Sequence, residues 1–435
     1  MASLIGTPTR GVRMLSNNLR PSSIIVFPAF CLASAIVASA ALTHLLGIVG
    51  FTAMPYVRLV VVAAAMLFVA VFLLQTRLKP TLASGNLWRA VLALQGLGLV
   101  YLVLGLLRQN SHFYLVTDLA YLAMFFLTFL LGAWCYRIGR LQFSYATMLR
   151  VVLTLVGLTS VCWVLDLQVG TPPELLILWG CALVIALAYK RYVHACLLLL
   201  AVVPQIAGLN RALLLAIVGG LMIYFFSSAW VKKIRLVCVL TVLLVALTLA
   251  LDGLGILQGS SFERRIDETL TLLSAEEGGD MPVPLQQRLY EGALVSQDIQ
   301  QSMLPVSLLF GMGAGYTLDM TQSSDSSVVD SQLLGGQHTH NIHLLSYALL
   351  ARFGLLGAAC FIFIFLTCAR RSYVLFKRIP TDKSTVELLA NLFVVLLFLF
   401  SIPASSFLFS SMLLGYFCGI ANEARLTGAR SRLLC

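Results

Sequence analysis

The sequence predicts an all-α polytopic integral membrane protein, and two observations predict it. Hydrophobic residues make up 60% of the 435-residue chain and charged residues 11%, with a mean hydropathy of +0.94, whereas soluble proteins carry about 25% charged residues. Apolar runs also recur along almost the whole chain. We therefore expect a single integral membrane domain over residues 1–435, without an added soluble domain.

About twelve apolar runs predict the transmembrane helices. In chain order, their cores cover residues 24–42, 59–74, 91–107, 119–134, 151–165, 175–188, 193–206, 212–226, 236–251, 354–367, 388–400 and 408–420. We expect the first run to be a retained signal anchor rather than a cleaved signal peptide. Several runs are shorter than the roughly 20 residues that cross a bilayer. Broken helices, or helices that extend through polar ends inside the bundle, are therefore expected.

The distribution of Lys and Arg predicts the orientation. Most of the 29 basic residues fall in alternate connecting segments, and acidic residues show the opposite bias. Basic residues collect in cytoplasmic loops, so we expect both termini in the cytoplasm and residues 252–341 outside. The net charge of +11 comes from scattered segments rather than one patch, which argues against a nucleic-acid partner.

The outer segment 252–341 is the long interruption of the apolar pattern, at roughly 90 residues between the ninth and tenth spans. Loops of this length are usually functional or disordered. It contains two stretches with helical character, SSFERRIDETLTLLSAEE and PLQQRLYEGALVSQDIQQS, and a polar stretch that we expect to be mobile, TQSSDSSVVDSQLLGG. We expect catalytic and donor-binding residues in this periplasmic loop.

Seven arginines fall in the segments predicted to lie outside the cytoplasm, where basic residues are otherwise rare. A specific role or partner is therefore expected for each of them. They are Arg58, Arg108, Arg211, Arg264, Arg265, Arg288 and Arg352. Arg211 opens an apolar helix, where it opposes the macrodipole and costs up to about 2.5–3.5 kcal/mol at membrane depth. An anionic ligand would offset both effects, and the alternative is a side chain that reaches lipid phosphate.

Four of these arginines are candidates for binding phosphate. Arg264, Arg265 and Arg288 have nearby carboxylates in the sequence, so an ordinary ion pair is the alternative for each of them. Together with Arg211 they place four guanidinium groups on one side of the membrane. Planar forks of this kind suit a phosphate or diphosphate.

Three of the six histidines cluster in the stretch GGQHTHNIH, as His338, His340 and His343. Three imidazoles at close spacing suit a zinc site, although no nearby acid or cysteine completes a familiar ligand set. A structural role is the second alternative. The third is a general base, because a neutral imidazole can take a proton from a hydroxyl group. Asn341 would cap the next helix or orient a substrate hydroxyl.

The order of these features resembles the O-antigen ligase and O-antigen polymerase superfamily of bacterial envelope glycosyltransferases. The resemblance covers residues 208–357. It rests on His340 with Asn341, the pair Gly354 and Gly357, the helix start at Arg211, and Arg288 followed by the glycines of GMGAG. Asn210 stands where the family has Ser. The spacing from Asn341 to Gly354 is about one helical turn longer than expected, so His338 stays a candidate beside His340.

The resemblance implies a GT-C-like fold in the bacterial inner membrane and a periplasmic active site. The reaction would be the inverting, metal-independent transfer of O-antigen from undecaprenyl pyrophosphate to a hydroxyl of lipid A-core oligosaccharide, with no cofactor. His340 or His338 would act as the base. Arg211, Arg288, Arg265 and Arg264 would bind the pyrophosphate, and Asn341, Gly354 and Gly357 would support the site.

Two kinds of alternative stay open. An O-antigen polymerase or a protein O-oligosaccharyltransferase of the same superfamily would share these motifs. From another class, a lipid or glycan transporter would use the arginines as a substrate path. A transporter predicts repeat symmetry and charges in paired broken helices, and the sequence displays neither pattern.

Overall fold

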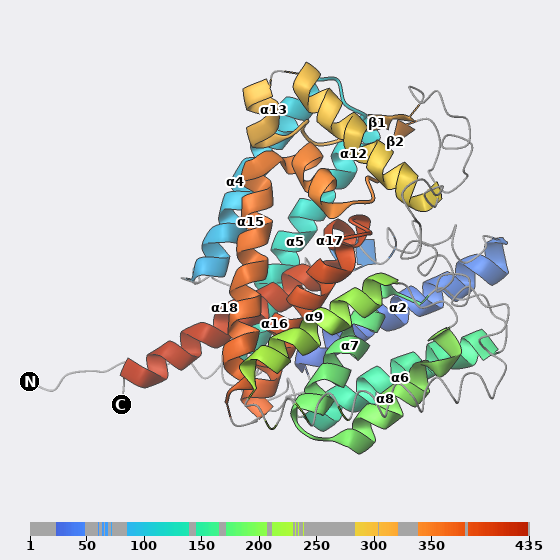
Figure 1. Cartoon of the computed structure of the whole chain (residues 1–435), viewed down its shortest axis with the longest axis vertical. Coiled ribbons are helices and arrows are strands. Elements are labelled where there is room, and N and C mark those ends of the chain that lie inside the picture. Colours follow the sequence, from blue (N-terminus) through green and yellow to red (C-terminus); the bar gives the residue numbers. More distant parts are fainter. Residues whose placement is uncertain are drawn as a thin grey trace, which may run out of the picture.

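The computed structural model describes residues 23–47, 85–138, 145–164, 171–206, 211–228, 283–302, 304–320, 338–378 and 382–433, with isolated positions among 60–71 and 231–238. These residues are mostly helical (Figure 1). The helices are α2 (Ser23–Leu46), α4 (Asn86–Leu107), α5 (His112–Ile138), α6 (Tyr145–Val164), α7 (Pro173–Ala188), α8 (Tyr192–Ile206), α9 (Arg211–Ser227), α12 (Val283–Gln301), α13 (Leu304–Phe310), α15 (Leu345–Phe376), α16 (Asp382–Ser401), α17 (Ser406–Ser410) and α18 (Met412–Leu433).

Most of the helices coincide with the predicted span cores, because a backbone in lipid has to form its hydrogen bonds internally, as it does in a helix. The cores at 59–74 and 236–251 fall mostly outside the described residues, and the core at 408–420 is divided between α17 and α18. Two predicted cores begin too late: α5 starts at His112 and therefore includes Asp118, and α15 starts at Leu345 rather than near residue 354.

Six of the helices in the described part of the chain are long and apolar enough to cross a membrane. They span Val26–His44, Asn86–Leu107, His112–Arg137, Tyr145–Cys162, Leu345–Phe376 and Ser384–Ser401, and α7, α8 and α9 supply shorter apolar helices. The protein is thus a mostly helical chain with the features of a multi-pass membrane protein. The total of about twelve spans stays a prediction.

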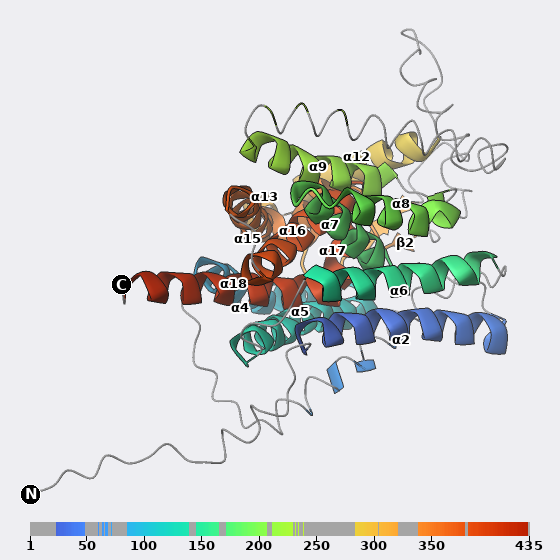
Figure 2. The same cartoon turned by 90° about the horizontal axis from the view of Figure 1, so that it is seen from below.

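The centre of the bundle is α16. It packs against α7, α9, α15 and α18, and its apolar span is the most deeply buried of the six. α18 runs along α5, where Gly132 lets the backbones touch: a Cβ there would lie 1.9 Å from the carbonyl oxygen of Tyr416. α2 and α6 lie side by side at the edge of the bundle (Figure 2).

One end of the bundle is built differently from the rest. There α12, α13 and a two-stranded antiparallel sheet cover the ends of α4, α5 and α15 (Figure 1). The sheet pairs β1 (Leu318–Asp319) with β2 (His338–Thr339). The sequence correctly predicts α12 from PLQQRLYEGALVSQDIQQS. The stretches SSFERRIDETLTLLSAEE and TQSSDSSVVDSQLLGG lie outside the described residues.

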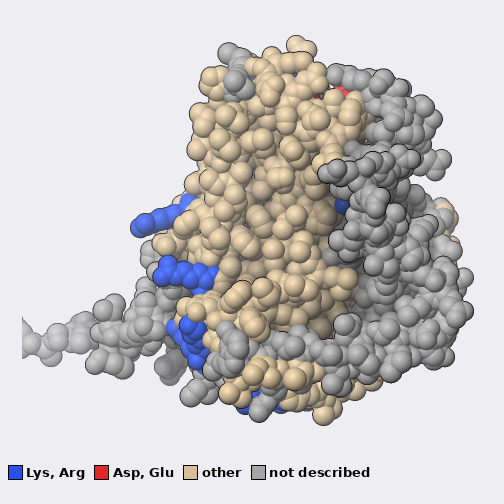
Figure 3. All heavy atoms as spheres, in the orientation of Figure 1, with Lys and Arg blue, Asp and Glu red and all other residues tan. Residues whose placement is uncertain are grey.

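On one face of the molecule, most of the visible Lys and Arg side chains lie away from this capped end (Figure 3). On the face in Figure 3, most of the blue side chains lie toward the lower left, whereas the upper part of that face is almost entirely uncharged. α15 joins the two ends, because it starts at Leu345 beside the histidine segment and reaches its C-cap at Lys377.

α15 is kinked at Gly354, where φ is 60° and ψ is −169°. Only glycine tolerates this region of φ and ψ. The kink frees the carbonyl of Ala351, which accepts a hydrogen bond from the N–H of Met312 at 2.5 Å. Gly357 lies where a Cβ would be 2.5 Å from the Tyr101 hydroxyl. The glycine pair of the family-like motif therefore permits close packing around the kink.

We expect Gly354→Ala to lower the free energy of unfolding by at least about 2 kcal/mol, from backbone strain and overpacking. A Cβ at Gly354 would lie 2.4 Å from backbone atoms of Leu309 and Gly311. Gly96 is the matched control, because it is helical and a Cβ there meets no atom within 4 Å. Gly96→Ala should be neutral or stabilise by up to about 1 kcal/mol. Thermal unfolding in detergent measures both variants, and equal melting temperatures would contradict the strain at Gly354.

Candidate active site

Asp118 is a buried carboxylate near the start of α5, with 4% of its surface exposed. Its Oδ1 lies 3.1 Å from Nε2 of His340 and 3.6 Å from Nη1 of Arg352. Its Oδ2 accepts a hydrogen bond from the backbone N–H of Gly315 at 2.8 Å. A charged side chain inside an apolar helix is costly and needs such partners. Asp118 therefore connects α5 to α15 through Arg352, and to the loop segments that carry Gly315 and His340.

Arg352 is the buried cation of this cluster. It projects from the first half of α15, is 4% exposed, and lies over the ring of Phe409 at 5.1 Å. Its Nη2 donates a hydrogen bond to the backbone carbonyl of His340. The contact with Asp118 therefore explains why an arginine lies on this side of the membrane, against the predicted distribution of basic residues.

His340 has an oxygen partner on each ring nitrogen, and its side chain is 10% exposed. Nδ1 lies 2.7 Å from the carbonyl oxygen of Tyr316. A carbonyl only accepts, so Nδ1 carries a proton. Nε2 faces Oδ1 of Asp118 at 3.1 Å, so this nitrogen is the one beside the carboxylate. The proton on Nδ1 is inferred from its partner.

The ring of Tyr114 covers one side of the imidazole. The two rings are stacked, with centroids 4.3 Å apart and planes at 15°. Tyr114 comes from α5, one turn before Asp118, so a single helix supplies both the carboxylate and the stacking ring. An aromatic face also favours a cation placed against it.

The glycine-rich segment 311–315 positions two of the polar atoms. Its three glycines all have positive φ, at 77°, 87° and 76°, which is why glycine is needed there. The side-chain amide of Asn110 donates to two carbonyls of the segment, at 3.0 and 2.9 Å. The turn thereby directs the N–H of Gly315 at the carboxylate and the carbonyl of Tyr316 at the imidazole.

Tyr316 is itself held by α12. Its hydroxyl donates to Oδ2 of Asp298 at 2.5 Å. Burial, and then this hydrogen bond to a carboxylate, raise the pKa of Tyr316 well above its usual range. The phenol therefore stays protonated and keeps the carbonyl of the same residue in place against His340.

The three histidines of GGQHTHNIH separate rather than cluster. His338 lies in β2 with 63% of its side chain exposed, and its Nδ1 is 3.8 Å from Asp319. Nδ1 of His343 lies 2.8 Å from Oε1 of Glu291. Each imidazole thus has its own carboxylate, and among the described residues no three His, Cys, Asp or Glu side chains group as metal ligands.

The other predicted site residues have different outcomes. Arg264 and Arg265 lie outside the described residues, and so does the side chain of Arg211, whose backbone begins α9. Arg288 is half-buried on α12. Asn341 is exposed and does not cap α15, because Leu344 precedes the helix without a side-chain cap. The diphosphate-binding role of the arginines stays a prediction.

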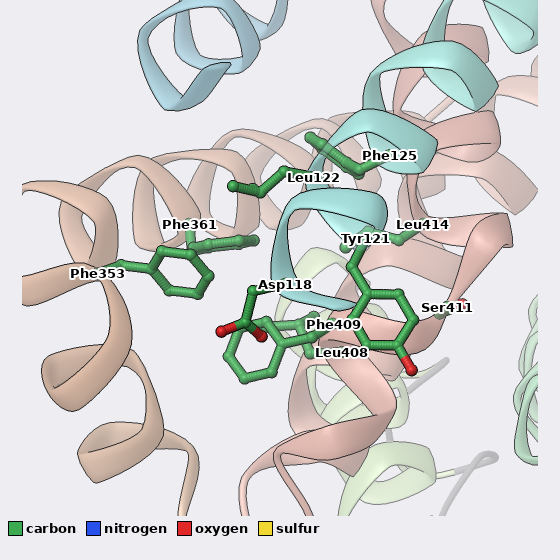
Figure 4. A pocket seen from close by; sticks show the side chains of 10 residues that line it. All are labelled: Asp118, Tyr121, Leu122, Phe125, Phe353, Phe361, Leu408, Phe409, Ser411 and Leu414. Atoms are coloured by element: carbon green, nitrogen blue, oxygen red, sulfur yellow. The ribbon is translucent and has the colours of Figure 1, made fainter. Parts of the chain in front are cut away.

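An apolar pocket lies directly beside Asp118. Its lining residues are Asp118, Tyr121, Leu122, Phe125, Phe353, Phe361, Leu408, Phe409, Ser411 and Leu414. In Figure 4 the carboxylate lies among the rings of Phe353, Phe361 and Phe409. Hydrocarbon on one side of a buried charge excludes water and strengthens the electrostatic interactions there.

Sequence reasoning missed Asp118 and the role of Glu291. An ionisable residue inside a membrane helix is a functional candidate by default, and Asp118 in LVTDLAYLAMFF satisfies that rule. It escaped because the predicted span began at residue 119. Glu291 is one of the nearby carboxylates that the sequence offers Arg288 as an ion-pair partner, and the sequence indicates no other role for it. Its contact with His343 joins residues far apart in the sequence, so no local pattern indicates it.

The fold and the site define a helical, multi-pass type of membrane protein with a buried carboxylate, imidazole and guanidinium at one end of the bundle. Comparison with known proteins gave no relatives: no protein-family model matches the chain, and no curated protein matches it.

Proposed function

We propose that the protein is an O-antigen ligase-type glycosyltransferase of the bacterial inner membrane. It would move a glycan from undecaprenyl pyrophosphate to a hydroxyl of lipid A-core oligosaccharide. One observation carries the proposal: His340, the histidine of the family-like motif, lies in a buried cluster with Asp118 and Arg352 beside an apolar pocket. Strongly interacting ionisable groups in such a place are typical of proton-transfer sites.

The geometry of α15 supports a periplasmic site. The helix has 32 residues, which corresponds to a length of about 48 Å before the kink is considered. His340 precedes its first residue, and Lys377 and Arg378 follow its last. If the basic end lies in the cytoplasm, the cluster lies on the opposite side of the membrane. With the twelve predicted spans, both chain termini would then be cytoplasmic.

The proposed proton transfer uses Nε2 of His340. With Nδ1–H fixed on the Tyr316 carbonyl, Nε2 is the nitrogen that can gain or lose a proton. When Nε2 is unprotonated, its lone pair faces a carboxylate 3.1 Å away. That contact is repulsive, so the neutral ring would leave the Tyr316 carbonyl and turn Nε2 toward the acceptor hydroxyl. After transfer, the imidazolium returns to Asp118, whose charge stabilises it.

The bond changes follow a single displacement. The acceptor O–H bond breaks and its proton goes to Nε2. The acceptor oxygen forms a bond to the anomeric carbon as the bond from that carbon to the pyrophosphate oxygen breaks, with inversion. The leaving pyrophosphate takes the electron pair. Guanidinium groups that bind this growing charge lower the barrier, and Arg211, Arg288, Arg264 and Arg265 are the candidates.

The test is reconstitution in liposomes with purified lipid-linked glycan and lipid A-core, with and without a chelator. We expect glycan on lipid A-core in both samples, because arginines rather than a cation bind the diphosphate in this proposal. If glycan chains lengthen on the polyprenyl carrier instead, the protein is a polymerase rather than a ligase. Loss of activity on chelation would contradict metal-independent transfer. Movement of the lipid-linked glycan between leaflets, without transfer, would favour a transporter.

A further inference from the structure

A second buried carboxylate pairs with the histidine segment. Glu291, on α12, has a side chain that is 1% exposed. Its Oε2 accepts the backbone N–H of His343 at 2.9 Å, and its Oε1 lies 2.8 Å from Nδ1 of the same residue. One carboxylate thus binds both a main-chain and a side-chain donor of His343. Such a two-point contact fixes orientation as well as distance.

The segment bound by Glu291 is also fixed to the rest of the bundle. The N–H of Ser405 donates to the carbonyl of His343 at 2.9 Å, and the N–H of Leu345 donates to the carbonyl of Ile402 at 2.9 Å. His340, three residues earlier, is bound by Asp118. Residues 340–345 therefore form a rigid base against which α12 can be placed.

α12 has two further contacts with residues that adjoin this base. Asp298 accepts the hydroxyl of Tyr316, whose carbonyl holds His340. Gly292, next to Glu291, lies against Tyr347 in the first turn of α15, where a Cβ would be 2.4 Å from the ring. The contacts of α12 with the segment around His340 therefore run from Glu291, in the middle of the helix, to Asp298, near its end.

We propose that Glu291 is a positioning residue, which through His343 holds α12 at a fixed distance and rotation relative to His340. The side chain that benefits is Arg288, one turn before Glu291 on the same helix and therefore close to it on the helix surface. The role of Arg288 as a diphosphate ligand rests on the proposed function. The contact between α12 and His343 does not.

The consequence is a division of labour between two carboxylate–imidazole pairs. Asp118 and His340 would carry the proton, whereas Glu291 and His343 would set where the diphosphate lies relative to them. The diphosphate is already charged in the bound donor, so a weakened arginine contact destabilises the bound donor and the transition state alike, which raises KM and leaves kcat nearly unchanged. A loosened α12 should therefore affect the donor far more than the acceptor.

The test compares His343→Ala with His343→Asn in the full-length protein. Asn keeps an N–H donor near the position of Nδ1, whereas Ala removes it. We expect His343→Ala to raise the KM for the lipid-linked donor about tenfold and to change kcat and the acceptor KM by less than about threefold. His343→Asn should stay within about threefold of the parent. His44→Ala, at an exposed histidine in the last turn of α2, is the control and should leave all three constants unchanged.

A second comparison asks whether the effect passes through Arg288. If it does, His343→Ala combined with Arg288→Ala should have no higher donor KM than Arg288→Ala alone. Independent, multiplied effects would overturn the proposal. So would a fall in kcat with an unchanged donor KM, or equal effects of Ala and Asn at residue 343.

Binding of farnesyl diphosphate to the purified protein separates this inference from the proposed function. Weaker binding in His343→Ala but not in His343→Asn, in a preparation that transfers no glycan, would keep the positioning role and reject glycosyl transfer. Equal binding by the parent and both variants would reject the positioning role, whether or not glycan is transferred.

Discussion

His340→Ala is expected to lower glycosyl transfer at least about a hundredfold, the lower end of what a positioned general base supplies. The substitution removes the Nε2 that faces Asp118 at 3.1 Å. The fold should survive, because Asp118 keeps Arg352 and the N–H of Gly315 as partners. Reconstituted transfer measures the activity, and thermal unfolding in detergent monitors the fold.

The matched control for this experiment is His338→Ala, which tests the other histidine that the motif left as a candidate base. His338 is 63% exposed on its side chain and lies 3.8 Å from Asp319. A rim contact of this kind contributes little, so activity should stay within about twofold. If His338→Ala abolished transfer and His340→Ala did not, the assignment of the base would be reversed.

The sequence predicts the helices well because hydropathy is a local property. Ten or more apolar residues in a row form a helix wherever they lie in the bundle, so α7 and α16 could be predicted without knowing their neighbours. Boundaries depend on polar residues at the ends, and these depend on partners. Asp118 was placed outside its span because its partners, His340 and Arg352, lie more than 200 residues away.

The candidate site could be predicted only in part for the same reason. Local patterns indicated His340, and the charge bias marked Arg352 as unusual. Neither pattern indicated that the two residues share one carboxylate. That arrangement depends on the turn at 311–315 and on the kink at Gly354, which together bring α5 and α15 to the same loop. Backbone geometry of this kind is a tertiary property.

The electrostatics of the cluster explain why it tolerates burial. The carboxylate of Asp118 lies between the imidazole of His340 and the guanidinium of Arg352, and it also accepts a backbone N–H. Loss of one partner leaves another buried charge uncompensated, and that cost exceeds the net value of the pair. Substitutions on either side of the pair should therefore affect stability before any effect on chemistry is considered.

Arg352→Met is expected to lower the free energy of unfolding by about 3–5 kcal/mol, as is usual when one partner of a buried ion pair is removed. Met approximates the length of the arginine stem and can keep the contact with Phe409, so the loss reflects the charge. Asp118→Asn should destabilise by a similar amount, because it leaves the buried guanidinium of Arg352 without its carboxylate, although the amide oxygen can still accept the N–H of Gly315. Thermal unfolding in detergent gives both values.

The double variant Asp118→Asn with Arg352→Met is the decisive comparison, because it removes both charges together. We expect it to be less destabilised than the sum of the single variants by about 0.5–3 kcal/mol, the range for residues in direct contact. Strict additivity would show that the 3.6 Å contact contributes nothing. Asp319→Asn, at the exposed pair, controls for loss of an acid and should change stability by less than about 0.5 kcal/mol. Transfer is measured in the same variants at a temperature at which each is folded. Transfer that stays low in folded Asp118→Asn assigns Asp118 a role in the proton transfer itself, and transfer near the parent level would confine Asp118 to the fold.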